Sequence, residues 1–248
     1  MYTRKDYIES SSPVEKELLM LFRKKSLKVI FDIGSCEGED SIKYSKLFPD
    51  ARIVSFEPLP DNQKLIKDNL SKYAVRNVEV IPVALSDRKG TADFHVSSGS
   101  PEGRSNTDQW NFGNKSSSLL KPDKHLEVTP WVKFDQVITV PTDTLENVCE
   151  ELKIADIDFA HIDVQGAELK VLKGAGKMLE NIKAIWMEVS NITLYQNQPL
   201  KTEVEKFMQE SGFCLYINAI AGTSGDQMYI NRRYFKQKCW ILDLKKMF

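Results

Sequence analysis

Three acidic residues of this sequence stand where an apolar run ends. Asp32 lies in the run of residues 29–33, Glu57 follows residues 52–56, and Asp163 follows residues 159–162. Apolar runs of this length are typical of buried parallel strands. Ligands bind outside the carboxyl ends of such strands, so we expect these carboxylates beside a common crevice.

Glycines follow the first of these runs at positions 34 and 38, and a helical pattern begins directly after them. A glycine turn lets a ligand approach the backbone, because no Cβ stands in the way. The helix start offers free N–H groups and the positive end of a dipole. These features predict a nucleotide-like ligand; the alternative is an ordinary strand-to-helix turn with a capping role.

Asp32 indicates which ligand of this kind fits. Its carboxylate would repel a pyrophosphate but suits a cation, such as the amino or sulfonium group of S-adenosylmethionine. The G-x-x-x-G spacing also differs from the G-x-G-x-x-G fingerprint of dinucleotide sites. Glu57, at the end of the second strand, is placed to bind two ribose hydroxyls. We therefore expect S-adenosylmethionine to be bound by Asp32, Gly34, Ser35, Gly38, Glu57 and Pro58.

The composition suits one α/β domain of 248 residues, with 34 basic and 35 acidic side chains and a formal charge of −1. This balance argues against a protein dedicated to nucleic acid. No apolar run approaches membrane-spanning length, and the first residues lack the apolar core of a signal peptide. We expect a cytoplasmic protein without a membrane span.

The four cysteines, at positions 36, 149, 214 and 239, are scattered and lack C-x-x-C spacing. We expect reduced thiols, with no disulfide and no zinc site. The His and Asp spacings suggest no metal site either.

The rest of the chain alternates helical and strand patterns. Residues 1–10 look like a polar arm, and Ser12 followed by Pro13 predicts a helix that runs to about Lys25. Further helices are expected at residues 39–48, 61–73, 142–152, 165–174 and, as the last one, 200–212. Strands are expected at residues 78–85, 131–140 and 183–189, with an edge strand at 91–96 and a terminal antiparallel pair at 214–220 and 227–230.

This order predicts an α/β fold of the class I methyltransferase type. Its Rossmann-like sheet would have seven main strands in the order 3-2-1-4-5-7-6, with helices on both faces. An arm and helix at residues 1–27 would precede a single domain, residues 28–248, with an inserted β and loop segment at about 91–140. In such a sheet Ala84 and Leu85 would seat the adenine edge by backbone groups and apolar contact.

The segment of residues 97–118 breaks the α/β rhythm, because it is rich in Ser, Gly and Asn. A long loop inside a compact domain is usually functional or disordered. Trp110 and Phe112 lie within it. They suit either a lid over a ring-shaped substrate, such as a sugar, or aromatic packing local to an insertion.

Residues 29–232 resemble the FkbM-type methyltransferases. The most specific segment is HIDVQGAELKVLKGA at residues 161–175, which is similar to the K-I-D-V-E-G-A-E-x-x-V-L-x-G-A pattern typical of that family. His161 and Gln165 depart from this pattern, which has Lys and Glu at those places. The resemblance implies S-adenosylmethionine as methyl donor and a hydroxyl oxygen as acceptor, often on a sugar or a secondary metabolite.

Such a reaction needs a base that receives the hydroxyl proton. Asp163 is the first candidate, followed by His161, on the same side of its strand, and Glu188. The alternatives are that Asp163 binds the cofactor amine or caps a helix, that His161 is a hydrogen-bonded strand residue, and that Glu188 pairs with a lysine. Glu168 is expected to bond nearby backbone N–H groups. Gln165 keeps hydrogen-bonding capacity but can neither hold a proton nor bind a metal well.

The sequence leaves two rival functions. One is an NAD-dependent oxidoreductase or epimerase, against which the missing G-x-G-x-x-G and the absence of a Tyr-x-x-x-Lys pair near the fourth strand count. The other is a non-catalytic cofactor-binding module that recognises glycans, favoured only by Gln165. The expected partner is a small-molecule or glycan acceptor.

Overall fold

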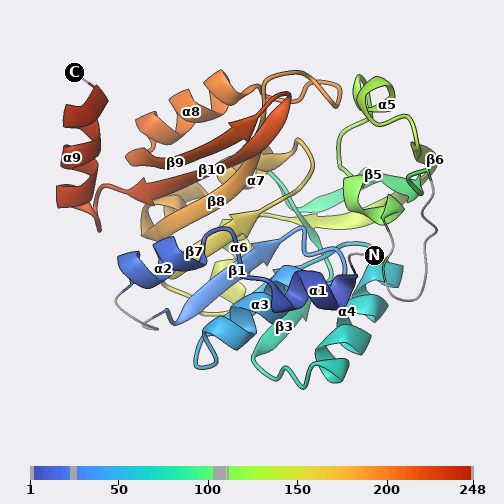
Figure 1. Ribbon diagram of the computed structural model, residues 1–248, viewed down its shortest axis with the longest axis horizontal. Coiled ribbons are helices and arrows are strands. Elements are labelled where there is room, and N and C mark those ends of the chain that lie inside the picture. Colours follow the sequence, from blue (N-terminus) through green and yellow to red (C-terminus); the bar gives the residue numbers. More distant parts are fainter. Residues whose placement is uncertain (1–2, 23–26, 103–109, 111, 247–248) are drawn as a thin grey trace.

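A twisted sheet of mostly parallel strands runs through the middle of the molecule (Figure 1). The computed structural model describes residues 3–22, 27–102, 110 and 112–246. Within these residues seven strands form the sheet: β1 (Val29–Ile33), β2 (Arg52–Phe56), β3 (Val78–Ile81), β7 (Ile157–Ile162), β8 (Ile182–Ser190), β9 (Phe213–Ala221) and β10 (Ser224–Asn231).

The strands follow the order β3-β2-β1-β7-β8-β10-β9, and β10 is antiparallel to both its neighbours. When the strands of this sheet alone are numbered along the chain, the order is the predicted 3-2-1-4-5-7-6. The register sets Asp32 of β1 directly beside His161 of β7. The α/β class and its methyltransferase-type topology are therefore confirmed.

Alternate residues of the central strands bury against helices on opposite faces. Phe31 and Ala160 pack in a core with α6 (Leu145–Glu151), α7 (Glu168–Gly174) and α8 (Lys201–Glu210). Ile30 and Phe159, their chain neighbours, pack with α2 (Glu15–Leu21), α3 (Glu39–Leu47) and α9 (Lys236–Lys246). This is why the central strands read as continuous apolar runs. The other helical segments include α5 (His125–Val128), η1 (Gly113–Ser116) and η2 (Gly176–Asn181). Leu179 of η2 packs in the same core as Phe31 and Ala160.

A second, three-stranded sheet takes the order β4-β6-β5, with β4 (Ala84–Leu85), β5 (Gly90–Gly99) and β6 (Val132–Asp143). The prediction of one strand at residues 78–85 is wrong. Pro82 follows β3 and has no N–H to continue the ladder, so Ala84 and Leu85 pair with β6 instead. The expected edge strand at 91–96 is likewise part of this second sheet, paired along β6.

The segment expected as a polar arm contains a short helix that was not predicted. Residues Arg4–Glu9 form α1, which begins with a capping box: the Thr3 hydroxyl accepts from the Asp6 N–H, and the Asp6 carboxylate accepts from the Thr3 N–H. Ser12 does not cap the next helix, which begins at Glu15 and ends at Leu21. The predicted extension of that helix to Lys25 lies outside the described residues.

The C-terminal part corrects two further predictions. The helix at 201–210 is not the last one, because α9 follows the terminal strand pair. Cys214 of β9 and Cys239 of α9 form a disulfide, so the expectation of four reduced thiols is wrong for these two; Cys36 and Cys149 are free. Spacing could not show this pairing, because the two cysteines meet only once α9 packs back on β9.

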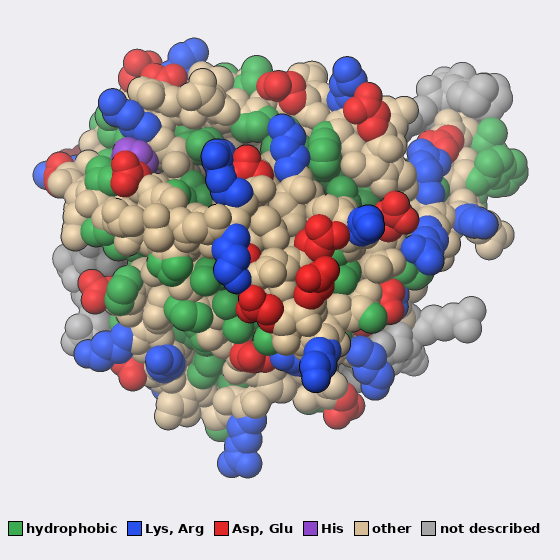
Figure 2. Space-filling model, turned by 180° about the vertical axis from the view of Figure 1, so that it is seen from behind, with side chains coloured by type: hydrophobic (Ala, Val, Ile, Leu, Met, Phe, Trp, Pro, Cys, Tyr) green, Lys and Arg blue, Asp and Glu red, His purple; other side chains and the backbone are tan. Residues whose placement is uncertain are grey.

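Among the residues that the structure describes, no helix is both long and apolar enough to cross a membrane. Figure 2 shows acidic and basic side chains interspersed over the face opposite that of Figure 1, in keeping with the formal charge of −1.

Candidate active site

A cavity of about 210 Å³ lies over the carboxyl ends of β1, β2 and β7. The structure brings nine of the predicted site residues to its wall: Asp32, Gly34, Ser35, Glu57, Pro58, Ala84, Leu85, His161 and Asp163. Gly38 and Glu188 do not line it. Gly38 caps the start of α3, and Glu188 reaches the cavity wall only through the side chain of Gln165.

The turn after β1 joins the ends of three strands. The N–H groups of Gly34 and Ser35 both donate to the Phe56 carbonyl, at 3.0 and 3.1 Å. Gly34 has a φ of +87°, and a Cβ there would lie 1.9 Å from the Asp163 carbonyl oxygen. Only glycine therefore fits this position, and its close contact sets Asp163 against the turn.

Asp32 is almost fully buried, at 2% exposure, on the floor of the cavity. The Ser41 hydroxyl of α3 donates to its carboxylate at 2.5 Å, and His161 Nδ1 lies 3.7 Å from the other oxygen. Burial raises the pKa of Asp32 to about 6, against the opposing influence of His161 and the Ser41 hydrogen bond. A cationic ligand group beside Asp32 would restore its full charge.

Glu57 lines the cavity directly after β2. Its carboxylate accepts from the Leu59 N–H at 2.8 Å, which fixes it at the turn into α4 (Pro60–Lys72). Burial raises the pKa of Glu57 to about 7, offset in part by the Leu59 hydrogen bond. Beside it the wall is apolar, formed by Phe56, Val83, Leu85, Phe94 and Leu119.

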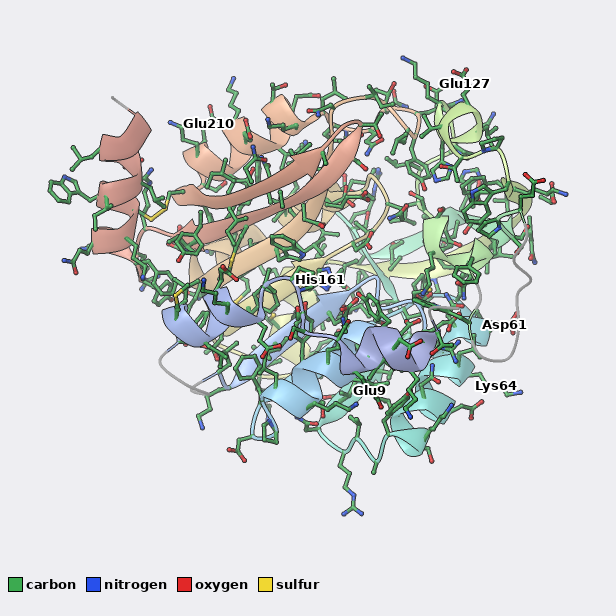
Figure 3. The ribbon with its side chains drawn as sticks, viewed as in Figure 1. Glu9, Asp61, Lys64, Glu127, His161 and Glu210 are labelled. Carbon is green, nitrogen blue, oxygen red and sulfur yellow. A yellow bond between two sulfur atoms is a disulfide. The ribbon has the colours of Figure 1, made fainter. Side chains whose placement is uncertain are left out.

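His161 lines the cavity and lies near the centre of the molecule in Figure 3, whereas Glu127 and Glu210 lie at its rim. The Tyr44 hydroxyl lies 3.2 Å from its Nδ1. Burial disfavours a charge on His161, but the nearby carboxylates of Asp40 and Asp32 outweigh it and raise its pKa. Its Nδ1 therefore lies among an acid, Asp32, and a hydroxyl, that of Tyr44.

Asp163 directly follows β7 and faces the cavity. The carboxamide nitrogen of Gln165 donates to its Oδ1 at 2.7 Å and to Glu188 Oε2 at 3.1 Å. Burial raises the pKa of Asp163, while the Gln165 hydrogen bond and His161 lower it. Burial, and then the charge of Asp163, raise the pKa of Glu188 well above its usual range.

Glu168 serves the backbone, which confirms its predicted structural role. Its Oε1 accepts from the N–H groups of Val164 and Gly166, at 3.2 and 3.0 Å. Oxygen atoms of Glu168, Asp163 and Glu188 lie within 4.8 Å of one another, a grouping that no sequence spacing indicated. Two of these three acids already share the Gln165 amide, and the third accepts two backbone N–H groups.

Sequence reasoning missed two residues of the cavity wall, Tyr7 and Asp40, which lie beside the predicted Trp110. Tyr7 of α1 donates its hydroxyl to Asp40 of α3, at 3.0 Å from each carboxylate oxygen, and its ring lies 5.7 Å from that of Trp110. All three line the cavity. Asp40, two residues after Gly38, could have been found from the sequence as an acid in the first turn after the glycines. Nothing in the sequence connects Tyr7 to the site.

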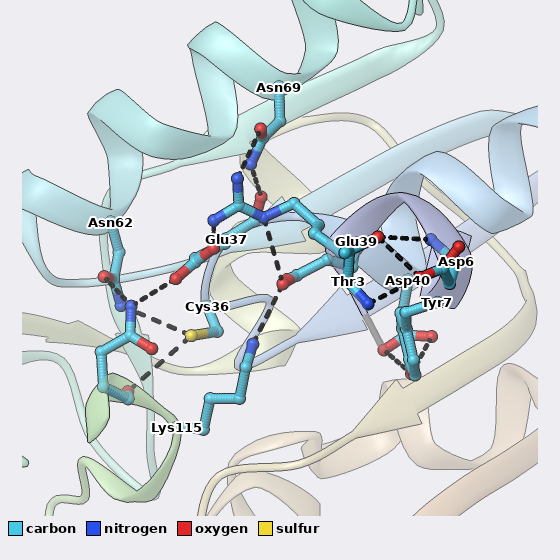
Figure 4. A network of polar contacts seen from close by, with 12 residues as sticks. Thr3, Asp6, Tyr7, Cys36, Glu37, Glu39, Asp40, Asn62, Asn69 and Lys115 are labelled. Carbon is cyan, nitrogen blue, oxygen red and sulfur yellow. Dashed lines mark hydrogen bonds and ion pairs between the residues drawn. The ribbon is translucent and has the colours of Figure 1, made fainter. Parts of the chain in front are cut away.

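A network of charged groups joins the N-terminal helix, the start of α3 and the insertion (Figure 4). Arg4 pairs with the fully buried Glu37, which also accepts from the Asn114 side chain at 2.9 Å. Lys115 of η1 pairs with Glu39 at 3.0 Å. Burial opposes the charge of Lys115, but Cys36 and Glu39 raise its pKa nonetheless. Of the predicted lid, residues 103–109 and 111 lie outside the described residues; Trp110 does line the cavity.

The fold and this site define a Rossmann-like methyltransferase. Residues 32–215 match the methyltransferase FkbM domain. The chain is 32% identical to the 2-O-methyltransferase NoeI of Sinorhizobium fredii over 225 residues, which cover 90% of this chain and 87% of that protein. It is 25% identical to the methyltransferase sdnD of Sordaria araneosa over 194 residues, 74% of this chain and 73% of that one. This chain belongs to the FkbM methyltransferase family.

The fold also resembles that of an rRNA methylase from Streptococcus thermophilus, with a TM-score of 0.48, 12% identity, and coverage of 89% of this chain and 97% of that one.

Proposed function

We propose that this methyltransferase uses S-adenosylmethionine to methylate a hydroxyl oxygen of a sugar, a glycan or a secondary metabolite. The observation that carries the proposal is the position of Asp32, Glu57 and Asp163. Asp32 lies in β1, and Glu57 and Asp163 directly follow β2 and β7; all three face one cavity, with a glycine turn between the first two. In this arrangement Asp32 faces a cationic group, Glu57 faces a diol, and Asp163 faces the proton of the acceptor hydroxyl.

The wall of the cavity fits such a cofactor from end to end. Glu57 is placed to accept hydrogen bonds from two ribose hydroxyls, and the apolar wall around Phe94 and Leu85 suits a flat base. Asp32 and the Gly34 turn suit the amino acid end, because a buried carboxylate favours a neighbouring positive charge. When bound, this cofactor supplies an electrophilic methyl group on a positively charged sulfur.

The remaining chemistry belongs to the side chains near Asp163. An alcohol is a weak nucleophile until its proton has an acceptor, and general-base help is worth about 10²–10⁴-fold. Asp163 is the proposed acceptor of that proton. Its carboxylate lines the cavity and is already fixed on one side by Gln165, which leaves the other side for the hydroxyl. His161 and Tyr44 support the adjoining Asp32.

The acceptor type rests on two observations. NoeI, the relative of 32% identity, is named for methylation of an oxygen. The acceptor end of the cavity offers Asp40, Tyr7 and Trp110, a carboxylate and two aromatic rings. Carboxylates accept from hydroxyl groups, and aromatic rings supply contact area for the faces of a ring-shaped molecule.

A cofactor titration tests the donor assignment. We expect calorimetry to detect binding of S-adenosylhomocysteine and no binding of NAD, since Asp32 would face the pyrophosphate of NAD with like charge. Binding of NAD alone would overturn the proposal in favour of an oxidoreductase. A broad panel of sugar and glycan acceptors, assayed for methyl transfer, then separates an enzyme from a binding module.

Substitution of Asp163 tests the base. We expect Asp163→Asn to reduce kcat by about 10²–10⁴-fold while the affinity for S-adenosylhomocysteine stays within a few-fold of the wild type. Asn keeps the shape and one hydrogen bond to the cavity but cannot receive a proton. Near-normal turnover by this variant would exclude Asp163 as the base and leave it a structural role.

We also propose that residues 28–248 form one catalytic domain, with residues 1–27 as its N-terminal cover and residues 91–140 as an insertion. Side chains of α2 share a core with the central sheet, which supports a fixed position for this cover. A cytoplasmic location stays a prediction. The disulfide between Cys214 and Cys239 removes part of its basis, because disulfides are rare in that compartment.

A further inference from the structure

One amide stands among the acids of the site. Gln165 Nε2 lies 2.7 Å from Asp163 Oδ1 and 3.1 Å from Glu188 Oε2. Ionised carboxylates only accept hydrogen bonds, so the group between them must donate. The amide nitrogen has two N–H groups and can serve both acids at once, whereas a carboxylate in its place would have no proton to give.

The carbonyl end of this amide faces the hydroxyl of Tyr195, whose single O–H is shared between two acceptors. The Tyr195 hydroxyl lies 3.1 Å from Gln165 Oε1, and Tyr195 is buried and lies 2.7 Å from the Ser116 carbonyl. The backbone is held as well: the Gln165 carbonyl accepts from the Ser118 hydroxyl at 2.7 Å. Gln165 has a φ of +54°, in the left-handed region that is strained for a residue with a Cβ. This backbone conformation places the side-chain amide of Gln165 between the two acids.

We propose that Gln165 is a positioning residue, which keeps the Asp163 carboxylate charged and turned toward the acceptor hydroxyl. The proposal rests on the proposed function of Asp163 as the base. By donating to Oδ1, the amide leaves Oδ2 for the proton of the acceptor. By donating to Glu188 as well, it holds the second acid at a fixed distance.

Other groups act on Asp163 from the surrounding elements. They are His161 on β7, Glu188 on β8, Asp226 on β10, Glu168 on α7, Asp40 on α3, Lys115 on η1 and Tyr195 after β8. Most of these groups are acids, and together with burial they favour a protonated Asp163. The Gln165 amide is the largest influence in the opposite direction. Without it, the base would bind its own proton at higher pH and could not take that of the acceptor.

Two substitutions distinguish the effect of the Gln165 N–H donors from the effect of its side-chain shape. Gln165→Met keeps the length and removes the N–H groups without adding charge. Gln165→Glu keeps the shape and the contact with Tyr195 but adds a further acid. We expect the pKa of Asp163 to rise in the order wild type, Gln165→Met, Gln165→Glu, with a step of about one pH unit or more for the loss of a charged hydrogen bond.

The carboxyl ¹³C resonance of Asp163 measures this pKa directly in the free protein. It can be recorded with ¹³C-labelled aspartate and assigned by its loss in Asp163→Asn. An unchanged titration midpoint in Gln165→Met would overturn the proposal. Because this readout needs no acceptor, it stays informative if methyl transfer fails. If Asp163→Asn is inactive and the Asp163 midpoint is unshifted in Gln165→Met, only the proposed role of Gln165 is refuted. If Asp163→Asn is active, the proposed role of Asp163 as the base is refuted.

Gln198 provides the matched control. It is also a buried glutamine, its Oε1 accepts from the N–H groups of Leu194 and Tyr195, and it packs against Gly166. We expect Gln198→Met to lower the melting temperature without moving the Asp163 midpoint. When kcat is measured against pH with an acceptor found in the sugar and glycan panel, activity should be lost on the acid side at higher pH in both Gln165 variants than in the wild type. In Gln198→Met this acid limb of the profile should stay in place. A limb that stays in place in the Gln165 variants would contradict the proposal.

Discussion

Glu168 supports the backbone of the site with a carboxyl group that is costly to ionise. Its Oε1 accepts from two N–H groups, and burial raises its pKa to about 7. The folded protein therefore binds more protons than the unfolded chain between pH 4.5 and 7. The contribution of Glu168 to the free energy of unfolding is therefore fully favourable below this pH window. The free energy of unfolding falls as the pH rises through the window.

We expect Glu168→Gln to flatten this pH dependence. The amide oxygen of Gln accepts the same two N–H groups but stays neutral, so the variant avoids a cost of up to about 3 kcal/mol at pH 8. Urea unfolding at pH 5 and pH 8 measures the slope. Glu127→Gln, at the exposed surface of α5, is the control and should keep the slope of the wild type. An equally steep slope in Glu168→Gln would contradict the account.

Of the residues that line the cavity, those at the end of a strand could be predicted from the sequence alone. Asp32, Glu57 and Asp163 are tied to the strand pattern, and the parallel sheet brings strand ends together. Tyr7 and Lys115 could not be found, because they reach the cavity through long-range contacts of α1 and η1 that no local pattern records. In the sequence Gln165 stands out only as a departure from a family pattern, because its partners Glu188 and Tyr195 are distant along the chain.

At the scale of elements, the turn between β1 and α3 holds the site together. We expect Gly34→Ala to unfold the protein or to cost more than about 4 kcal/mol, because its Cβ would overlap the Asp163 carbonyl and its φ of +87° is strained. Gly212→Ala is the control: it has a similar φ of +85°, but no atom lies within 4 Å of the added Cβ. That variant should lose only the strain, about 1–2 kcal/mol.

Chemical denaturation of the two variants compares them directly. Equal losses would mean that the turn tolerates the added carbon and that backbone strain alone matters at Gly34. A larger loss for Gly34→Ala would show that the contact between the β1 turn and the end of β7 is required.

Elements whose boundaries depend on a local signal were largely predictable. The strands β1, β2 and β7 agree with the predicted runs within a few residues, since burial on both faces leaves an apolar stretch. The predictions differ from the structure where a single local signal decides, as with Pro82 directly after β3 and the Thr3–Asp6 capping box of α1. The sheet to which β5 belongs depends on tertiary contacts, which strand propensity does not predict.

For the molecule as a whole, the disulfide is a constraint on the C-terminal layer. It closes a loop between Cys214 and Cys239, 25 positions apart, and attaches α9 to β9. Closing a loop of this length in the unfolded chain is worth about 3–4 kcal/mol. We expect a reductant, or Cys239→Ser, to lower the free energy of unfolding by about this amount.

Urea titration with and without reductant measures the effect, and thiol titration of the denatured, unreduced protein should find two thiols, from Cys36 and Cys149. Cys149→Ser, which lacks a role in the cross-link, should respond to the reductant as the wild type does. Four thiols and an unchanged unfolding midpoint would show that the pair is reduced.

The pairing of β4 with β6 has a consequence for how this enzyme could be re-engineered. Ala84 and Leu85 line the cavity beside the expected adenine site, yet they are hydrogen-bonded to the last strand of the insertion rather than to the main sheet. The insertion therefore cannot be exchanged without affecting the cavity wall. A chimera that exchanged residues 91–140 with those of a relative, in order to change the acceptor, would also rebuild the support of the cofactor wall, and the graft would have to begin at Ala84 and end at Asp143.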